Sequence, residues 1–162
     1  MPVRTEKQTE RLKRRLYQTR DCGTCNVCCT LLSIPELNKP AGKPCQHLAK
    51  EGKGCGTYAT RPESCEAWAC VWRSGSNVVE PSERPDRSGI MLDTMRPAPG
   101  KPEARGLLVY ETEPGGFAKA DAIIQRLAAK WPVVLMSDPR KLIGPVDEVE
   151  AFLRDVPEGE RP

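Results

Sequence analysis

The sequence has no apolar segment long enough to cross a membrane. Its longest purely apolar runs, at residues 106–110 and 132–136, fall far short of the roughly 20 residues that a membrane-spanning helix needs. The N-terminal residues are charged, and no apolar stretch or small-residue cleavage site follows them, as would be found in a secretory signal. We therefore expect a soluble, cytoplasmic protein that is neither exported nor bound to a membrane.

Familiar catalytic motifs are missing from the C-terminal half of the chain. It contains no phosphate-binding loop, no nucleophile elbow and no paired histidine-glutamate motif. Its carboxylates are most simply surface or helix-capping groups, among them Asp121, Asp138, Asp147 and Glu148. We therefore assign no catalytic residue, and we expect a binding protein rather than an enzyme.

The sequence also has little net charge. A value of +3 at pH 7 does not by itself indicate a nucleic-acid partner. Residues 1–20 hold seven lysines or arginines against two glutamates, so this leader carries +5. Leu12 and Leu16 lie four residues apart among strong helix formers, which predicts a helix over residues 5–20. Because the leader lacks repeated aromatic residues, we interpret it as a solvated helix and do not favour nucleic-acid binding.

Composition divides the chain into four segments. These are a basic helical leader, a cysteine segment, a polar connector and a cysteine-free region, at residues 1–21, 22–75, 76–88 and 89–156. Glycine and proline are frequent in the first part of the cysteine segment, which favours loops over regular elements. A bound metal would supply the core that such loops lack.

Periodicity predicts one helix in the cysteine segment and a small α+β region after the connector. Pro62 at a favoured helix start, followed by the apolar residues Trp68, Val71 and Trp72, predicts a helix over residues 62–73. Beyond the connector the pattern predicts a strand, a strand, a helix, a strand and a helix, at residues 90–95, 107–112, 117–130, 133–136 and 146–153, with a loop at 96–106. This β-β-α-β-α order predicts an α+β fold in which helices cover a sheet.

The clearest chemical signal is a set of eight cysteines, Cys22, Cys25, Cys28, Cys29, Cys45, Cys55, Cys65 and Cys70. The first four form the motif CxxCxxCC. A CxxC step lets two thiolates turn toward one ion while the intervening amides donate to the sulfurs. A reducing cytosol keeps thiols free, so we expect these cysteines to bind metal rather than to form disulfides.

Cys28 and Cys29 are adjacent, and this constrains how they bind. Successive side chains of an extended chain point to opposite sides, so we predict that the two thiolates serve different metals or different atoms of one cluster. Eight thiolates then make two four-ligand sites or one multinuclear cluster. His47, the only histidine, is either a further ligand or a loop residue, because eight cysteines already suffice for two tetrahedral sites.

A site with so many thiolates is strongly anionic. We expect basic residues nearby in sequence to offset its charge, namely Arg20, Lys43, Lys53, Arg61 and Arg73. Cys65 lies near the start of its predicted helix, where the helix dipole is expected to favour the thiolate.

Two further stretches accompany CxxCxxCC at Cys22–Cys29. They are Pro44-Cys45-Gln46-His47-Leu48, and Gly-Cys-Gly-Thr-Tyr-Ala-Thr-Arg-Pro-Glu-Ser-Cys at residues 54–65. Together the three stretches resemble the bacterial YkgJ-type cysteine-cluster family. The resemblance covers about residues 20–73 and implies a domain that chelates zinc or iron, without naming a biological role. The chain departs from the family at Thr57, where isoleucine is frequent, and at Trp68, where phenylalanine is frequent. Neither position is a proposed ligand.

These observations predict a metal-binding protein that chelates zinc, as two or more ions, or iron. Two alternatives stay open. One is an iron-sulfur redox protein or oxidoreductase subunit, and the other is an adaptor whose C-terminal half binds a protein partner while the metal segment serves as scaffold. Other readings fit less well: disulfides would need export, a thioredoxin-like pair at Cys22 and Cys25 would need a preceding strand, and a ferredoxin loop would need a cysteine in place of Leu32.

Overall fold

The computed structural model describes residues 20–52, 54–94 and 106–145. Three predicted features lie outside these residues. They are the leader helix predicted over residues 5–20, apart from its last residue, nearly all of the loop at 96–106, and the last helix at 146–153. No helix among the described residues is long and apolar enough to span a membrane.

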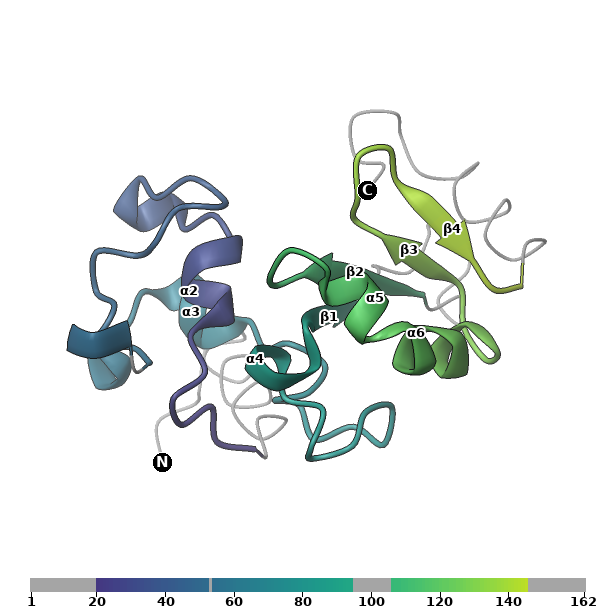
Figure 1. The fold of residues 1–162 in the computed structure, drawn as a ribbon. Helices are drawn as coiled ribbons and strands as arrows, with labels where there is room; N and C mark the ends of the chain where they lie inside the picture. The colour runs from purple at the N-terminus through teal and green to yellow at the C-terminus, as the bar shows by residue number, and fades with distance from the viewer. Residues whose placement is uncertain (1–19, 53, 95–105, 146–162) are drawn as a thin grey trace, which may run out of the picture. The chain divides into compact units, whose positions relative to one another are not determined.

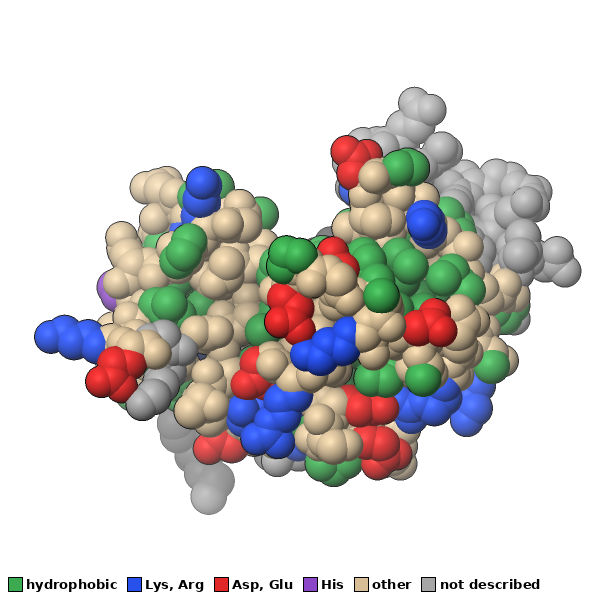
Figure 2. All heavy atoms as spheres, in the orientation of Figure 1, with side chains coloured by type: hydrophobic (Ala, Val, Ile, Leu, Met, Phe, Trp, Pro, Cys, Tyr) green, Lys and Arg blue, Asp and Glu red, His purple; other side chains and the backbone are tan. Residues whose placement is uncertain are grey.

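The chain divides into two compact units, an N-terminal unit, Met1–Asp86, and a C-terminal unit, Arg87–Pro162. Figure 1 shows that short helices and loops make up the first unit and that the sheet belongs to the second. On the face drawn in Figure 2, the basic and acidic side chains of the described residues are intermixed. The finer division into leader, cysteine segment and connector stays a prediction.

The N-terminal unit consists of short helical elements joined by loops. In chain order they are α2 (Val27–Leu31), η1 (Pro35–Leu37), η2 (Lys50–Gly52), η3 (Tyr58–Thr60), α3 (Glu63–Ala67) and the start of α4 (Pro85–Ser88), where η denotes a 3-10 turn. Two of these helices were not predicted from the sequence. They are α2, which lies inside CxxCxxCC, and α4, which lies in the predicted connector. Helices of five and four residues carry too little periodicity to be recognised.

The helix predicted over residues 62–73 is α3, and it ends at Ala67. The next residue, Trp68, has an extended backbone with φ −103° and ψ 142°. Val71 and Trp72, which the prediction assigned to the helix, lie outside it and are only 4% and 8% exposed. Their apolar spacing therefore reflects burial in a turn, and the predicted helix is wrong beyond residue 67.

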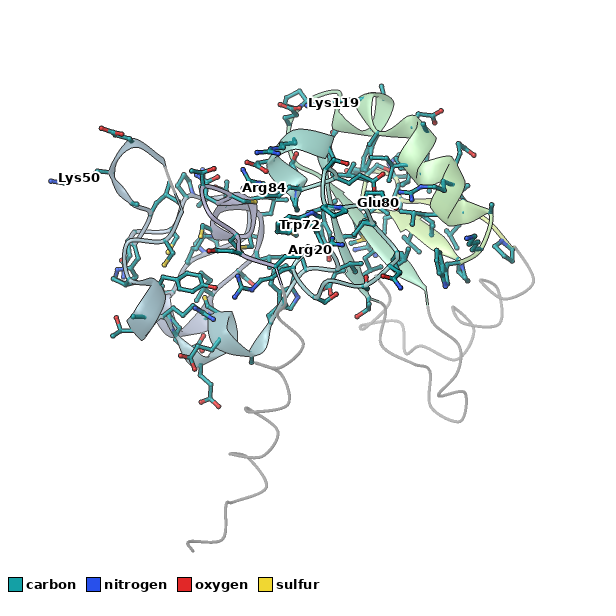
Figure 3. The ribbon with its side chains drawn as sticks, turned by 90° about the horizontal axis from the view of Figure 1, so that it is seen from below. Arg20, Lys50, Trp72, Glu80, Arg84 and Lys119 are labelled. Atoms are coloured by element: carbon teal, nitrogen blue, oxygen red, sulfur yellow. The ribbon has the colours of Figure 1, made fainter. Side chains whose placement is uncertain are left out.

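Trp72 anchors the chain that follows the cysteines. Its indole nitrogen donates to the Pro81 carbonyl at 3.0 Å. Arg20 lies over the same indole, with 5.5 Å between its guanidinium carbon and the ring centroid, and Figure 3 shows the two side chains together. Arg20 also donates to the carbonyls of Trp72 and Val79, at 3.2 and 3.0 Å. Residue 20 is thereby held against residues 72–81.

The described part of the C-terminal unit contains a four-stranded mixed sheet. Its strands are β1 (Ile90–Thr94), β2 (Leu107–Glu111), β3 (Val133–Leu135) and β4 (Lys141–Ile143), in the order β1-β2-β3-β4. β1 and β2 are antiparallel, with Leu92 opposite Val109, β2 and β3 are parallel, and β3 and β4 are antiparallel. The first three strands agree with the predicted strands.

Two helices connect β2 to β3 and cover one face of the sheet (Figure 1). They are α5 (Gly116–Lys119) and α6 (Asp121–Ala128). The sequence predicts them as one helix, but Ala120, with φ −96° and ψ 10°, separates them. The buried face of α6 consists of Ile124, Leu127 and Ala128. A crossover of this kind is what a parallel pair of strands requires.

The described residues thus form an α+β fold, as predicted, in which a loop-rich segment with short helices precedes a small sheet. Strand β4 was not predicted. Its burial pattern is exposed, exposed and intermediate, so it lacks the apolar alternation by which a half-buried strand is recognised.

Candidate metal centre

All eight cysteines lie in the N-terminal unit, and none of them forms a disulfide. Cys28 and Cys29 belong to α2 and Cys65 to α3, whereas the other five lie outside helices. Cys45 and Cys70 are buried, and the remaining six are intermediate. The thiols are therefore free and partly buried, and all of them belong to one loop-rich unit.

The first CxxC step forms a tight turn. The Cys25 amide donates to the Cys22 carbonyl at 2.9 Å, and Gly23 between them has a left-handed backbone with φ 54°. Arg84 spans this turn, because its guanidinium donates to the Cys22 carbonyl at 3.2 Å and to Thr24 Oγ1 at 3.0 Å. Burial raises the pKa of the Cys25 thiol. The turn fixes the spacing of two thiols before any ion is bound.

The Arg73 side chain reaches the sulfur of Cys22. Its Nη1 donates to Cys22 Sγ at 2.8 Å, and its guanidinium carbon lies 5.4 Å from the centroid of the Tyr58 ring. The carbonyl of Arg73 accepts from the Arg20 amide at 3.2 Å, so the two ends of the cysteine segment meet at this point. A guanidinium in this position offsets negative charge on the sulfur.

Cys70 lies beside the same turn. The pKa of its thiol is raised to about 11, chiefly by burial and in part by the negative charges of Cys22 and Cys25. The amides of Arg73 and Trp72 hydrogen-bond to the sulfur and lower that pKa in part. A cation bound by Cys70 would offset the cost of ionising this buried thiol, because the cation replaces the solvation that burial takes away.

Cys28 and Cys29 share a hydrogen bond that raises the pKa of Cys28 and lowers that of Cys29. At Cys28, burial and the negative charges of Cys29, Cys22 and Cys70 add to the rise in pKa. At Cys29, burial opposes the fall and the positive charge of Lys39 reinforces it. The pair therefore loses one proton readily and the second only when a cation compensates for the added charge.

Lys39 is a buried cation that was not among those predicted near the site. It is 7% exposed, and its Nζ donates to the carbonyls of Thr30 and Pro40, each at 3.1 Å, and of Leu32. Thr30 and Leu32 lie at the C-terminal end of α2, where the helix dipole attracts positive charge. The ammonium group therefore stabilises this helix end beside Cys29. Nothing in its sequence neighbourhood distinguishes it from a surface lysine.

Cys45 and Cys55 come together through the backbone. The Cys45 amide donates to the Cys29 carbonyl at 2.9 Å, and the Leu48 amide donates to the Cys45 carbonyl at 3.0 Å. Leu48 in turn pairs with Cys55 in an isolated antiparallel bridge. These bonds form a chain of contacts from α2 to the loop that carries Cys55.

His47 contacts a cysteine through its backbone. Its amide donates to Cys45 Sγ at 3.4 Å, while its ring Nε2 lies 3.3 Å from Nε2 of Gln46. An amide that donates to a cysteine sulfur two residues earlier is the arrangement expected of a thiolate ligand. A role of the imidazole as a metal ligand stays a prediction.

The pKa of the Cys65 thiol lies above its ordinary value. Burial raises this pKa, a hydrogen bond from the Ser64 side chain lowers it, and the negative charges of Cys29, Cys45 and Glu36 raise it again. The net effect of these groups disfavours the bare thiolate. The contribution of the α3 dipole to this thiolate stays a prediction.

The turn of α3 that carries Cys65 is fixed from two sides. Glu36 in η1 accepts from the Ser64 amide at 3.0 Å through Oε1 and from the Ser64 hydroxyl at 2.9 Å through Oε2. Arg61 donates to the carbonyls of Tyr58 and Cys65, at 3.0 and 3.3 Å. Its guanidinium carbon lies 4.0 Å from the centroid of the Tyr58 ring.

The cations expected near the site have different roles. Arg73 contacts a sulfur directly, whereas Arg20 and Arg61 donate to carbonyl groups. Lys43 is exposed, and Lys53 lies outside the described residues. Negative charge at the sulfurs is therefore offset by Arg73 and by Lys39, which was not predicted.

Within the described ranges, no group of three or more histidine, cysteine or carboxylate side chains is arranged so that it could hold a metal ion. The donor chemistry fits zinc or iron, since the thiols are free and their charges act on one another between loops. Comparison of the chain with protein-family models, curated proteins and solved structures finds no match. The eight-cysteine ligand set and the family resemblance stay predictions.

Proposed function

We propose that this chain binds two or more metal ions, zinc or iron, through the thiolates of its eight cysteines. The observation that carries the proposal is the gathering of eight free thiols in one compact unit. Burial raises the pKa of Cys25, Cys65 and Cys70, and the hydrogen bond to Cys29 together with burial raises that of Cys28. The negative charges of neighbouring cysteines add to the rise at all four thiols. Such a cluster is unfavourable as bare thiolates, and it becomes favourable when cations neutralise it.

The energetics of the N-terminal unit support the same proposal. The buried apolar side chains in its described part are Ile34, Cys45, Cys70, Val71, Trp72 and Val79, and two of them are cysteines. A buried large apolar side chain contributes about 1.5–3 kcal/mol, and ordering each residue costs about 1–2 kcal/mol. A structural zinc contributes on the order of 10 kcal/mol. Metal binding would therefore be the largest single stabilising interaction in this unit.

The surroundings of the sulfurs suit an anionic centre. Two divalent ions with eight thiolates leave a net charge of −4, which must be compensated. Arg73 donates to Cys22 Sγ, and the His47 amide donates to Cys45 Sγ. Lys39 supplies a buried positive charge near Cys29. Donors of this kind orient metal-bound thiolates and tune their affinity.

The choice between zinc and an iron-sulfur cluster decides whether the protein has redox chemistry. Zinc has none, whereas an iron-sulfur cluster contains sulfide and changes oxidation state. The CxxC geometry at Cys22 and Cys25 favours zinc, although the same thiols suit either. A brown protein whose visible absorption bleaches on reduction would identify the cluster and the redox alternative.

Hydrogen exchange of the full chain, before and after chelation under reducing conditions, tests the proposal. We expect amides of residues 22–73 to lose protection when the metal is removed. Amides of β2 and β3 serve as the internal control and are expected to keep their protection, because these strands lie in the other unit and have an apolar core. Equal exchange of residues 22–73 with and without chelator would contradict the proposal.

A further inference from the structure

Backbone and side-chain contacts divide the eight cysteines into two sets. The first cysteine group contains Cys22, Cys25, Cys28 and Cys70. The second cysteine group contains Cys29, Cys45, Cys55 and Cys65. The inference drawn from this division rests on the metal binding proposed above and specifies its ligand sets.

The first cysteine group is assembled where the start and the end of the cysteine segment meet. The Cys25 amide donates to the Cys22 carbonyl at 2.9 Å, which closes the first CxxC turn. Arg73, three residues after Cys70, donates to Cys22 Sγ at 2.8 Å, and its carbonyl accepts from the Arg20 amide at 3.2 Å. These bonds bring the turn that carries Cys70 to the turn that carries Cys22 and Cys25.

The second cysteine group is assembled from α2 and the loops that follow it. The Cys45 amide donates to the Cys29 carbonyl at 2.9 Å. Cys55 joins them through its bridge with Leu48, whose amide donates to the Cys45 carbonyl at 3.0 Å.

Cys65 joins the second group through α3. Glu36, in the η1 turn that follows α2, accepts from both the amide and the hydroxyl of Ser64, at 3.0 and 2.9 Å. This contact fixes the residue immediately before Cys65. The charges of Cys29 and Cys45 act on the Cys65 thiol, as expected for sulfurs that are close together.

Cys28 and Cys29 stand at the junction of the two groups. They are consecutive residues of α2, so their side chains leave the helix about 100° apart. The Cys28 thiol hydrogen-bonds to Cys29, and it also lies within reach of the charges of Cys22 and Cys70. Cys29 is joined to Cys45 by a backbone hydrogen bond. The glycines of the two loops also approach, since a Cβ on Gly54 would lie 2.8 Å from the Gly23 carbonyl oxygen.

We propose that the two cysteine groups form two four-thiolate metal sites, and that Cys28 and Cys29 bind different ions. In the described residues the side chains do not yet converge on two centres, so binding includes rotation of the thiols about χ1. The backbone arrangement limits which thiols each ion can collect. Two tetrahedral sites account for all eight cysteines without a further ligand.

Partial metal removal from the wild-type chain tests this division without any substitution. The reduced full chain is loaded with zinc under anaerobic conditions, treated with limiting chelator, alkylated and analysed by mass spectrometry. Native mass spectra are expected to contain a form with half of the bound zinc. In that form, alkylation is expected at all four thiols of one cysteine group and at none of the other.

Matched substitutions provide a second measurement. Cys70→Ser is expected to expose Cys22, Cys25 and Cys28 to alkylation while the second group stays protected, with half of the zinc retained. Cys45→Ser is expected to give the converse pattern. Combining the two substitutions is expected to abolish zinc binding.

The outcomes separate this inference from the proposed function. A wild-type chain that binds no zinc or iron under any loading condition overturns both. A metal-loaded chain that releases all its zinc in one step, or whose alkylation pattern mixes Cys28 with Cys29, overturns only the division into two sites. It would indicate a single multinuclear cluster.

Discussion

The neighbours of each sulfur in the N-terminal unit decide how readily it carries charge. Cys22 accepts a hydrogen bond from a guanidinium, whereas Cys70 is buried and accepts hydrogen bonds from the backbone amides of Arg73 and Trp72. The positive charge of Lys39 helps to lower the pKa of Cys29. A metal centre needs all of these sulfurs as thiolates, so the residues that offset their charge are expected to control metal affinity.

Replacing Arg73 by glutamine is expected to weaken metal binding by about 10- to 100-fold, as removal of a hydrogen-bond partner of a ligand typically does. The physical reason is the loss of the charged donor 2.8 Å from Cys22 Sγ. Affinity is measured by competition with a chromophoric chelator. Lys50→Gln is the control, because Lys50 carries the same charge in the same unit but is exposed and directed away from the rest of that unit (Figure 3). Equal losses in both variants would mean that only overall charge matters.

Replacing Lys39 by methionine is expected to destabilise the N-terminal unit by about 1–3 kcal/mol, since three carbonyl groups lose a charged donor. The free energy of unfolding is measured by urea titration of the full chain under one fixed metal condition. Lys50 is exposed, and Figure 3 shows its side chain directed away from the rest of its unit. Lys50→Met should therefore change stability by less than about 0.5 kcal/mol. A comparable loss in both variants would contradict this role of Lys39.

At the scale of elements, sequence periodicity predicted which apolar residues of the strands are buried. The apolar residues Leu107, Val109 and Val133 lie in predicted strands and are at most 5% exposed. The sequence could not locate the end of α3 or the start of β4. Trp72 is apolar at helical spacing but is buried through an indole hydrogen bond to Pro81, a tertiary contact that no local pattern contains. Short elements depend on such contacts more than on propensity.

The same limit applies to the candidate site. The motif CxxCxxCC pointed to the cysteines as candidate ligands. It also led to the prediction that Cys28 and Cys29 bind different metals or different atoms of one cluster. The spacing of Cys45, Cys55 and Cys65 gave no information on which thiols meet, because loops of these lengths have many conformations. The hydrogen bond from the Cys45 amide to the Cys29 carbonyl is a tertiary contact that the spacing does not contain, and it is one of the contacts from which we infer the grouping.

The link between η1 and α3 should depend on pH. The Glu36 amide and both donors of Ser64 bind the Glu36 carboxylate and lower its pKa from the usual 4.5. A lowered pKa means that this contact stabilises the folded form above pH 4.5 and is lost as the pH falls through the folded-state value. An NMR titration of Glu36 should therefore have its midpoint below 4.5, and Ser64→Ala should move it upward. An unchanged midpoint in the variant would contradict the contact.

The packing of α6 on the sheet can be tested with a matched pair of leucines. Leu127 in α6 is 0% exposed, whereas Leu142 in β4 is 44% exposed. Leu127→Ala is expected to cost about 2–5 kcal/mol of unfolding free energy, because it leaves a cavity in the core. Leu142→Ala should cost less than about 0.5 kcal/mol. Similar costs in thermal or urea unfolding would contradict the arrangement of this unit.

At the scale of the whole molecule, the two units are stabilised in different ways. The described part of the C-terminal unit has a continuous apolar core between α6 and its strands, with Val109, Leu127 and Val133 at 0% exposure. The described part of the N-terminal unit has short helices, few buried apolar residues and eight free thiols. We therefore expect metal removal to unfold the N-terminal unit and to leave the C-terminal unit folded.

The most direct test of this account is the metal and sulfide content of the full chain, purified anaerobically without a metal-affinity tag. The account predicts two or more zinc or iron ions per chain, with sulfide present only if the iron forms a cluster. After chelation under non-reducing conditions, alkylation should detect all eight thiols. A chain that contains no metal and whose eight cysteines are all in disulfides would contradict the account.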